Sequence, residues 1–329
     1  MSIGDGIGPD VSVVVPVRDR EALLQGLLGA LDRQTLDRAR FEVIIVDDYS
    51  VDRTRAIAQA WVDSDPSRRT LVVSEGKGPG HARNRGLSVA TAEWIAFTDS
   101  DTLPEPDWLE AGLRSVERLG AVAVEGAVEP WPPEAIGPQT HQVMNTTGGL
   151  YMTANMIYRR DVLDEVGGFD ERFYEPFLED SDLAFRVMDS GYDIPFAPEV
   201  RVRHHVRQPS FSDVLRSTRH QRWLSLFATK HPDRYWTHLR PAVRPLSSVD
   251  IDVILGLLST VALAKTRGPG RAVLFAIAAN GLKRGLASNG VFHGPREEAG
   301  SRAALAVGLP VARAFWWVEG CIRFRKLVW

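Results

Sequence analysis

Short runs of β-branched and aromatic residues alternate with longer amphipathic segments over the first hundred residues of the chain. The amphipathic segments predict helices at 21–33, 53–62 and 81–90, and the first of them repeats leucine at helical spacing. The apolar runs predict buried strands at 11–17, 41–46, 70–74 and 94–98. Strands that alternate with helices in this order predict a parallel sheet with helices on both faces.

The alternation continues less regularly to about residue 205. The pattern predicts helices at 108–119 and 160–166, with a third inside 177–190. It predicts strands at 121–128 and 193–202, and the second of these runs on to His204 and His205. The stretch 148–158 is expected only to lead into the helix that follows it.

Beyond residue 207 the pattern changes to helical segments. Two uncharged stretches, 253–264 and 272–282, are 12 and 11 residues long and flank the basic turn KTRGPGR. A bilayer span needs about 20 apolar residues. The last residues, AFWWVEGCIRFRKLVW, combine tryptophans with arginines and a lysine, which is typical of an interfacial membrane anchor. The alternative is a helical pair that packs in a core and in a dimer contact.

The charges are divided unevenly along the chain. Residues 1–200 hold 18 Lys and Arg against 35 Asp and Glu, whereas residues 201–329 hold 21 against 7, and the net charge is −3. Either the halves neutralise each other internally, or the basic half meets an anionic partner such as a membrane face. A single cysteine and a first segment without a basic leader favour a cytoplasmic protein.

Acidic residues stand directly behind several of the predicted strands. Asp47 and Asp48 follow the second strand, and Asp99 and Asp101 follow the fourth. In parallel sheets ligands bind beyond the carboxyl ends of the strands. Carboxylates gathered there repel each other unless a cation compensates, and Mg²⁺ or Mn²⁺ prefers such oxygen ligands. Taken alone, the stretch from Asp99 to Asp101 is equally compatible with a solvated turn.

Six segments together resemble the family 2 glycosyltransferases over about the first 230 residues. They are VSVVVPVRDR at 11–20, FEVIIVDDYSVDRT at 41–54, GPGHARNRGL at 78–87, AEWIAFTDSDTLPEPDWL at 92–109, TANMIYRRDVLDEVGGFDERF at 153–173 and FLEDSDLAFRVMDSGY at 177–192. The resemblance implies an α/β fold of the GT-A type, with a Rossmann-like, mixed and mainly parallel sheet flanked by helices. It also implies a catalytic domain at 1–230, which leaves 231–329 as a helical, basic C-terminal extension.

The resemblance assigns donor-binding roles at the strand ends. Pro16 and Arg18 would meet the nucleoside, and Asp48 would receive the N–H of the base, while Asp47 braces the turn. Arg83 would lie near phosphate or base. Asp99 would face the ribose and Asp101 would bind Mn²⁺ or Mg²⁺, which leads us to expect a nucleotide-sugar donor, with a UDP-sugar first.

On the acceptor side, the resemblance makes Asp180 of the Glu-Asp pair the general base. The alternative is that both carboxylates only favour a helix start. His204 falls where many relatives place a histidine near metal or diphosphate, although a purely structural histidine is equally compatible. Trp131 and Asn155 are expected to shape the acceptor side.

Together with these residues, the resemblance implies a metal-dependent glycosyltransferase, and it is the family alone that implies an inverting one. The expected partners are the donor and a saccharide or lipid-linked acceptor, with peripheral contact to the cytoplasmic face of a membrane through the C-terminal region and no nucleic acid. Two alternatives stay open. One is a nucleotidyltransferase of similar fold, although VRDREALL lacks its usual glycine pattern. The other is a non-catalytic nucleotide-sugar-binding protein.

Overall fold

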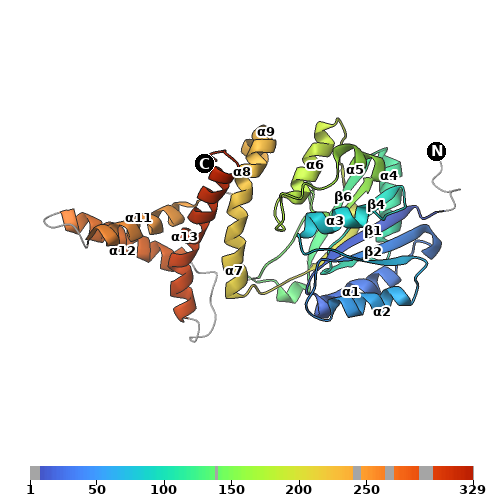
Figure 1. Ribbon diagram of the computed structural model, residues 1–329, viewed down its shortest axis with the longest axis horizontal. Coiled ribbons are helices and arrows are strands. Elements are labelled where there is room, and N and C mark those ends of the chain that lie inside the picture. Colours follow the sequence, from blue (N-terminus) through green and yellow to red (C-terminus); the bar gives the residue numbers. More distant parts are fainter. Residues whose placement is uncertain (1–7, 138–139, 240–245, 264–269, 289–298, 329) are drawn as a thin grey trace. The chain divides into compact units, whose positions relative to one another are not determined.

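The computed structural model describes residues 8–137, 140–239, 246–263, 270–288 and 299–328 (Figure 1). The chain divides into two compact units, one of Met1–Ile136 with Gln142–Arg207 and one of Gly137–His141 with Gln208–Trp329. The boundary at residue 230 between a catalytic domain and a C-terminal extension stays a prediction.

One mixed sheet of eight strands organises the described part of the first unit. Its spatial order is β3-β2-β1-β4-β7-β6-β8-β5. The strands are β1 (Val11–Val17), β2 (Phe41–Asp47), β3 (Arg69–Val73), β4 (Trp94–Phe97), β5 (Thr102–Pro104), β6 (Ala123–Trp131), β7 (Met156–Arg159) and β8 (Phe196–His205). The first four pair in parallel, as the alternating pattern predicts. The mixed, mainly parallel sheet of GT-A glycosyltransferases is thereby confirmed.

Helices cover both faces of this sheet. They are α1 (Glu21–Asp32), α2 (Thr54–Asp63), α3 (Pro79–Leu87), α4 (Trp108–Leu119), α5 (Arg160–Val166) and α6 (Glu179–Asp189). One apolar core lies between the sheet and α1, α2 and α4, and a second between the sheet and α3, α5 and α6. Val13 and Val15 enter the first core and Val14 the second, because successive strand residues face opposite sides. Figure 1 shows α1 and α2 on the opposite side of β1 and β2 from α3.

The sequence pattern does not predict two of the strands, and both lie next to strands that carry site residues. The segment 156–159 forms β7, which pairs antiparallel with both β4 and β6, whereas the pattern predicts only an approach to a helix. The three residues of β5 pair antiparallel with β8. Neither is long enough to show a period-2 pattern, and both owe their conformation to the strands beside them.

The described part of the second unit is helical. Its helices are α7 (Phe211–Ser217), α8 (Gln221–Lys230), α9 (Pro232–Arg234), α11 (Ser248–Leu263), α12 (Gly270–Ser288) and α13 (Ala299–Arg323). The helical C-terminal region that the sequence predicts is therefore present. Within the described ranges, every helix is too short or too polar to cross a membrane.

Candidate functional site

The short strand β5 places the acidic stretch next to a residue about a hundred positions away. After β4 the chain turns, with the Thr102 amide donating to the Asp99 carbonyl over 3.2 Å. Thr102 then pairs with His204 of β8, and the His205 amide donates to the Asp101 carbonyl over 2.9 Å. These backbone bonds hold Asp99, Asp101 and His204 at one edge of the sheet.

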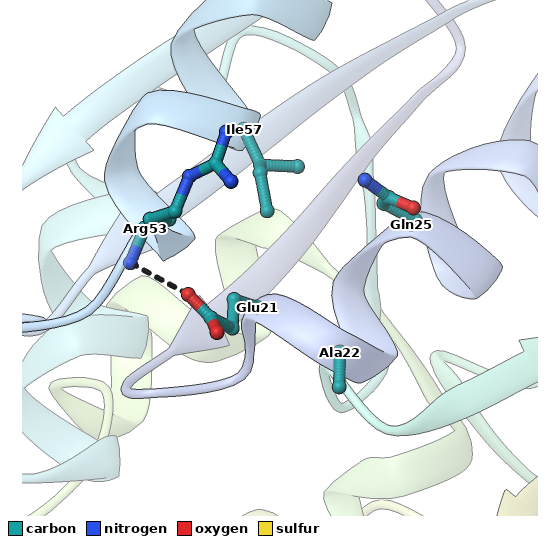
Figure 2. Close-up of a pocket in the computed structure, with 5 residues that line it drawn as sticks. All are labelled: Glu21, Ala22, Gln25, Arg53 and Ile57. Atoms are coloured by element: carbon teal, nitrogen blue, oxygen red, sulfur yellow. Dashed lines mark hydrogen bonds between the residues drawn. The ribbon is translucent and has the colours of Figure 1, made fainter.

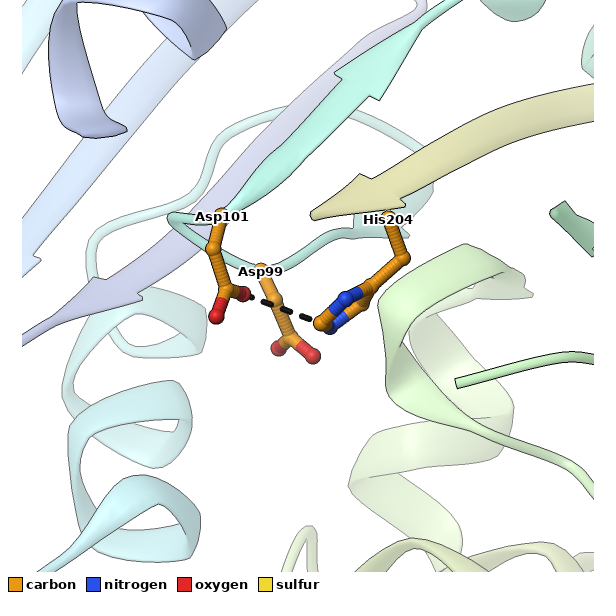
Figure 3. A group of neighbouring side chains, drawn as sticks. All are labelled: Asp99, Asp101 and His204. Atoms are coloured by element: carbon orange, nitrogen blue, oxygen red, sulfur yellow. Dashed lines mark ion pairs between the residues drawn. The ribbon is translucent and has the colours of Figure 1, made fainter. Parts of the chain in front are cut away.

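The three side chains form a group suited to a metal ion (Figure 3). Each offers one ligand atom, and these atoms lie within 4.8 Å of one another. His204 Nε2 is 3.3 Å from Asp101 Oδ1, while Nδ1 lies 3.2 Å from the His205 carbonyl oxygen. A nitrogen that faces a carbonyl has to carry the proton, so the neutral ring directs the Nε2 lone pair at a carboxylate. Such a contact requires a further proton or a cation between the two groups.

The chemistry of this group fits Mn²⁺ or Mg²⁺. Two carboxylates and one imidazole suit Mn²⁺, and Mg²⁺ is commonly held by one or two carboxylates together with substrate phosphates. A hydrogen bond from Nδ1 to a carbonyl oxygen is the arrangement that orients metal-binding histidines. Arg20 Nε lies 3.8 Å from Asp101 Oδ2 and supplies another positive charge at the rim.

Arg83 of α3 links this group to the start of α6. Its side chain is 4% exposed, with Nη2 2.8 Å from Asp99 Oδ1 and Nη1 3.2 Å from Glu179 Oε1. The guanidinium carbon also lies 5.5 Å from the centre of the Phe169 ring. Burial by itself would lower the pKa of Arg83, but the charges of Asp99, Glu179 and Asp180 outweigh it and raise the pKa. Arg83 is therefore a permanent cation between the two acidic groups.

The Glu-Asp pair begins α6 and has unusual acidity. Burial, and then the charge of Asp180, raises the pKa of Glu179 to about 8, although Arg83 opposes the shift. Burial also raises the pKa of Asp180 against the opposing charge of Arg83. Asp180 accepts hydrogen bonds from the Ser181 amide over 2.8 Å and from the Thr153 amide. A carboxylate with a raised pKa is a stronger base than an ordinary aspartate.

Asp48 lies at the end of β2 and holds the loop before α3. Its Oδ1 accepts from the Ser74 hydroxyl over 2.8 Å and from the Gly76 amide over 3.0 Å, and Oδ2 accepts from the Gly78 amide over 2.9 Å. Gly78 has φ 96°, and a Cβ there would lie 1.9 Å from the Tyr174 carbonyl oxygen. Asp48 therefore fixes the loop, and recognition of a base by Asp48 stays a prediction.

Two other predicted donor residues lie beside Asp48. Pro16 is inside β1, opposite Val46, and the strand continues to Val17. Arg18 follows it with its side chain 52% exposed and Nη1 4.0 Å from Asp48 Oδ2. Asp47 is fully buried, accepts from Arg55 Nε over 2.7 Å and from the Ser50 amide, and so braces the turn as expected.

Asn155 differs from the expectation. It is fully buried, and Nδ2 donates to the carbonyls of Ala127 and Val200 while Oδ1 accepts from Trp108 Nε1. These bonds join β6, β8 and α4, so Asn155 braces the sheet and has no surface to offer an acceptor. Trp131 is partly buried under the Arg203 guanidinium, 4.7 Å from its ring centre.

One buried carboxylate that is not among the predicted site residues holds the loop before Thr153. Glu125 of β6 accepts from Asn145 Nδ2 over 2.7 Å, from the Gly149 amide over 2.6 Å, from the Leu150 amide over 2.9 Å and from the Tyr151 amide. The loop it holds leads to Thr153, whose amide donates to Asp180. A signal was present, since a glutamate inside the apolar run AVAVEGAV needs a buried partner.

A separate hollow lies between the starts of α1 and α2 (Figure 2). It is lined by Glu21, Ala22, Gln25, Arg53 and Ile57, and the Arg53 amide donates to Glu21 Oε2 over 3.0 Å. None of the predicted site residues lines it. We assign it no role.

Two family models match the chain. The one described as glycosyl transferase family 2 matches residues 12–167, and the one described as glycosyl transferase family group 2 matches residues 94–267. Among curated proteins, glycosyltransferase AglE of Haloferax volcanii is 30% identical over 219 residues, which cover 63% of this chain and 70% of AglE. The pre-mycofactocin glycosyltransferase of Mycobacterium tuberculosis is 28% identical over 240 residues, which cover 68% of this chain and about half (49%) of that protein.

Solved structures share the fold. The mannosyltransferase PcManGT from Pyrobaculum calidifontis, in complex with GDP-Man and Mn²⁺, has a TM-score of 0.59 at 20% identity over 94% of this chain and 87% of its own. TarS residues 1–349 of S. aureus, in complex with UDP, has a TM-score of 0.51 at 18% identity over 84% of this chain and 88% of its own.

Proposed function

Because the chain belongs to the family 2 glycosyltransferases, we propose that it transfers a sugar from a nucleoside-diphosphate sugar to a hydroxyl acceptor in a metal-dependent, inverting reaction. The observation that carries the proposal is one connected group of charges. Asp101, His204 and Asp99 offer a metal site, and Arg83 joins Asp99 to the Glu-Asp pair. Donor-side and acceptor-side groups thus share one edge of the sheet.

On the donor side, we assign the metal to Asp101 and His204, with Asp99 as the third ligand atom or as a ribose contact. A divalent ion bound there would neutralise the diphosphate and stabilise it as a leaving group. Arg83 keeps Asp99 in place through a charge-assisted bond of 2.8 Å. Pro16, Arg18 and Asp48 would contact the nucleoside. UDP is our first choice of nucleotide, and PcManGT with GDP-Man makes GDP the second.

On the acceptor side, we assign the general base to Asp180. The acceptor oxygen forms the new bond to the anomeric carbon as the bond from that carbon to the diphosphate oxygen breaks, and the hydroxyl proton passes to Asp180. A single displacement of this kind inverts the anomeric configuration. The raised pKa of Asp180 favours proton uptake, and the Ser181 and Thr153 amides hold the carboxylate in one orientation.

We further propose a lipid-linked or cell-surface glycan precursor as the acceptor. In the sequence, residues 208–329 carry 18 Lys and Arg against 7 Asp and Glu. A basic region attracts an anionic membrane surface, which would bring the enzyme to a lipid-bound acceptor. We therefore propose contact with the cytoplasmic face of a membrane through the C-terminal region.

Asp180→Asn tests the base. General-base catalysis contributes about 10²- to 10⁴-fold, so turnover should fall by about that factor while donor affinity stays unchanged. Asp189→Asn, at an exposed position of the same helix, is the matched control and should keep full turnover. Product analysis should show a released nucleoside diphosphate. A fully active Asp180→Asn variant would contradict the base assignment, and released pyrophosphate would instead indicate a nucleotidyltransferase.

A further inference from the structure

The hairpin of α11 and α12 has its small residues inside and its large apolar residues outside. Along α11 the buried positions are Asp250, Val253, Gly256 and Ser259. On the same helix Leu255, Leu258 and Val261 are 47%, 63% and 66% exposed. A helix of a water-soluble domain normally shows the reverse, with its large apolar side chains in the core.

Close backbone contact explains why small residues occupy the interface. A Cβ on Gly256 would lie 3.2 Å from the Gly281 Cα, and a Cβ on Gly281 would lie 2.4 Å from the Asp252 carbonyl oxygen. Small residues that let two helices approach closely, with apolar side chains turned outward, are typical of helices packed in lipid. The hairpin has this arrangement although the first unit of the same chain is folded around ordinary apolar cores.

The apolar exposure of α12 is on two opposite sides. Val273 is 62% exposed and Phe275 is 68% exposed, and at 3.6 residues per turn these positions are about 200° apart around the helix. Gly281, between them in direction, is buried against α11. A second copy of the chain would cover one side of the hairpin, whereas lipid covers both.

Two ion pairs lie at the end of the hairpin where α11 begins. Asp252 of α11 pairs with Arg284 of α12, and Asp250 pairs with Arg313 of α13 over 3.1 Å. From there, residues 253–263 and 272–282 carry no charge, a length of roughly 16 Å at 1.5 Å per residue. The segment that joins the helices contains Lys265 and Arg267 in the sequence and lies outside the described residues.

We propose that the α11–α12 hairpin is embedded in one leaflet of an anionic phospholipid membrane. The inference builds on the membrane contact proposed above and replaces a general basic attraction with a specific inserted element. Charged residues stand at both ends of this uncharged length in the sequence, so the two helices lie along the membrane surface within one leaflet, and both ends reach the lipid headgroups. Residues 208–329 carry 18 Lys and Arg against 7 Asp and Glu, and this excess of positive charge favours anionic headgroups.

Site-specific fluorescence on the full-length protein tests the proposal. In a Cys321→Ser background, single cysteines replace Leu258, Val273 and Phe275 and carry an environment-sensitive nitrobenzoxadiazole label. With phosphatidylglycerol-containing vesicles, all three labels should shift to shorter wavelength and gain intensity. A label on Glu117→Cys, exposed on α4 of the first unit, should not respond.

Three results would overturn the inference. The hairpin is not in lipid if none of its labels responds while the protein still binds nucleotide, which shows that it is folded. A second copy covers it if only one of the Val273 and Phe275 labels responds, and does so with rising protein concentration in the absence of vesicles. The anionic preference is wrong if pure phosphatidylcholine vesicles bind as well, since we expect them to bind at least about tenfold less. Sugar transfer measured on the same samples separates failure of this inference from failure of the proposed reaction.

Discussion

The candidate site of the first unit and the hairpin of the second depart from ordinary burial in opposite directions. At the sheet edge, Arg83 and Glu179 are ionisable groups with almost no exposure. On the hairpin, Leu258 and Phe275 are large apolar groups with most of their surface exposed. Both are costly in isolation, because a buried charge needs a partner and an apolar surface in water has none.

The difference between the two regions indicates which kind of ligand each one is suited to bind. The carboxylates around Arg83 are suited to bind a further cation and, through it, a charged ligand. The apolar side chains on opposite sides of the α11–α12 hairpin are suited to contact with lipid. Under the proposed function, the first unit would catalyse sugar transfer and the second would bind the membrane, so each of the following changes should affect one task without the other.

The largest separable effect is expected from Glu125→Gln. The amide would turn an N–H toward the Gly149, Leu150 and Tyr151 amides, which now donate to the carboxylate. The loop would move, and Asp180 would lose the Thr153 amide that orients it. A displacement of about 1 Å at a reacting group costs on the order of 10²-fold in rate, so kcat should fall by about that factor.

Steady-state kinetics distinguish this positioning role from general damage. The donor KM should stay the same, and the pH at which kcat reaches half its maximum should fall as Asp180 becomes more exposed. Glu129→Gln, at an exposed position of the same strand, is the control. Equal kcat in the two variants would remove Glu125 from the acceptor side.

Glu179→Gln should change the pH dependence of stability. The folded-state pKa of Glu179 is about 8, above its ordinary value of 4.5, so the folded protein keeps a proton that the unfolded chain has released between these pH values. Unfolding then becomes easier as pH rises from about 4.5 to 8. Thermal melts at several pH values should show the wild type losing stability relative to Glu179→Gln across this window. A constant difference between the two would show that Glu179 is ionised throughout.

The smallest effect on catalysis is expected from Gly281→Ala. The added methyl group would lie 2.4 Å from the Asp252 carbonyl oxygen, so α11 and α12 have to move apart. Vesicle-bound protein should decrease a few-fold, while transfer to a water-soluble acceptor stays unchanged. Ala276→Ser, at an exposed position of α12, is the control. An equal loss of transfer to the soluble acceptor would contradict the separation of the two tasks.

Most of the sheet and its helices could be predicted from the sequence because their apolar periods are long. The strands 11–17 and 41–47 and the helices 108–119 and 160–166 need only local pattern. The strands β5 and β7 could not be predicted, since three and four residues show no period and form only against β8, β4 and β6. Yet β5 is the element that brings His204 to Asp101.

Site residues that belong to a sequence motif could be predicted. Contacts that depend on pairing between distant segments could not. The sequence indicates Asp99 and Asp101, and the structure adds that Arg83 binds both Asp99 and Glu179, the second of which lies 96 positions further along the chain than Arg83. Asn155 was placed on the acceptor side because it lies within a matching segment. Its three bonds to β6, β8 and α4 could be known only once those elements were packed.

We propose above all that Asp101 holds a divalent ion through which the donor is bound. The most direct measurement is a thermal shift of wild type and Asp101→Asn with UDP, GDP and their sugars, each with Mn²⁺ and with chelator. A ligand that binds only the folded state raises Tm according to its affinity. We predict that a nucleotide-sugar raises the Tm of the wild type with Mn²⁺ but not with chelator, and does not raise that of Asp101→Asn under either condition. An equal rise in chelator, or in the variant, would contradict the account.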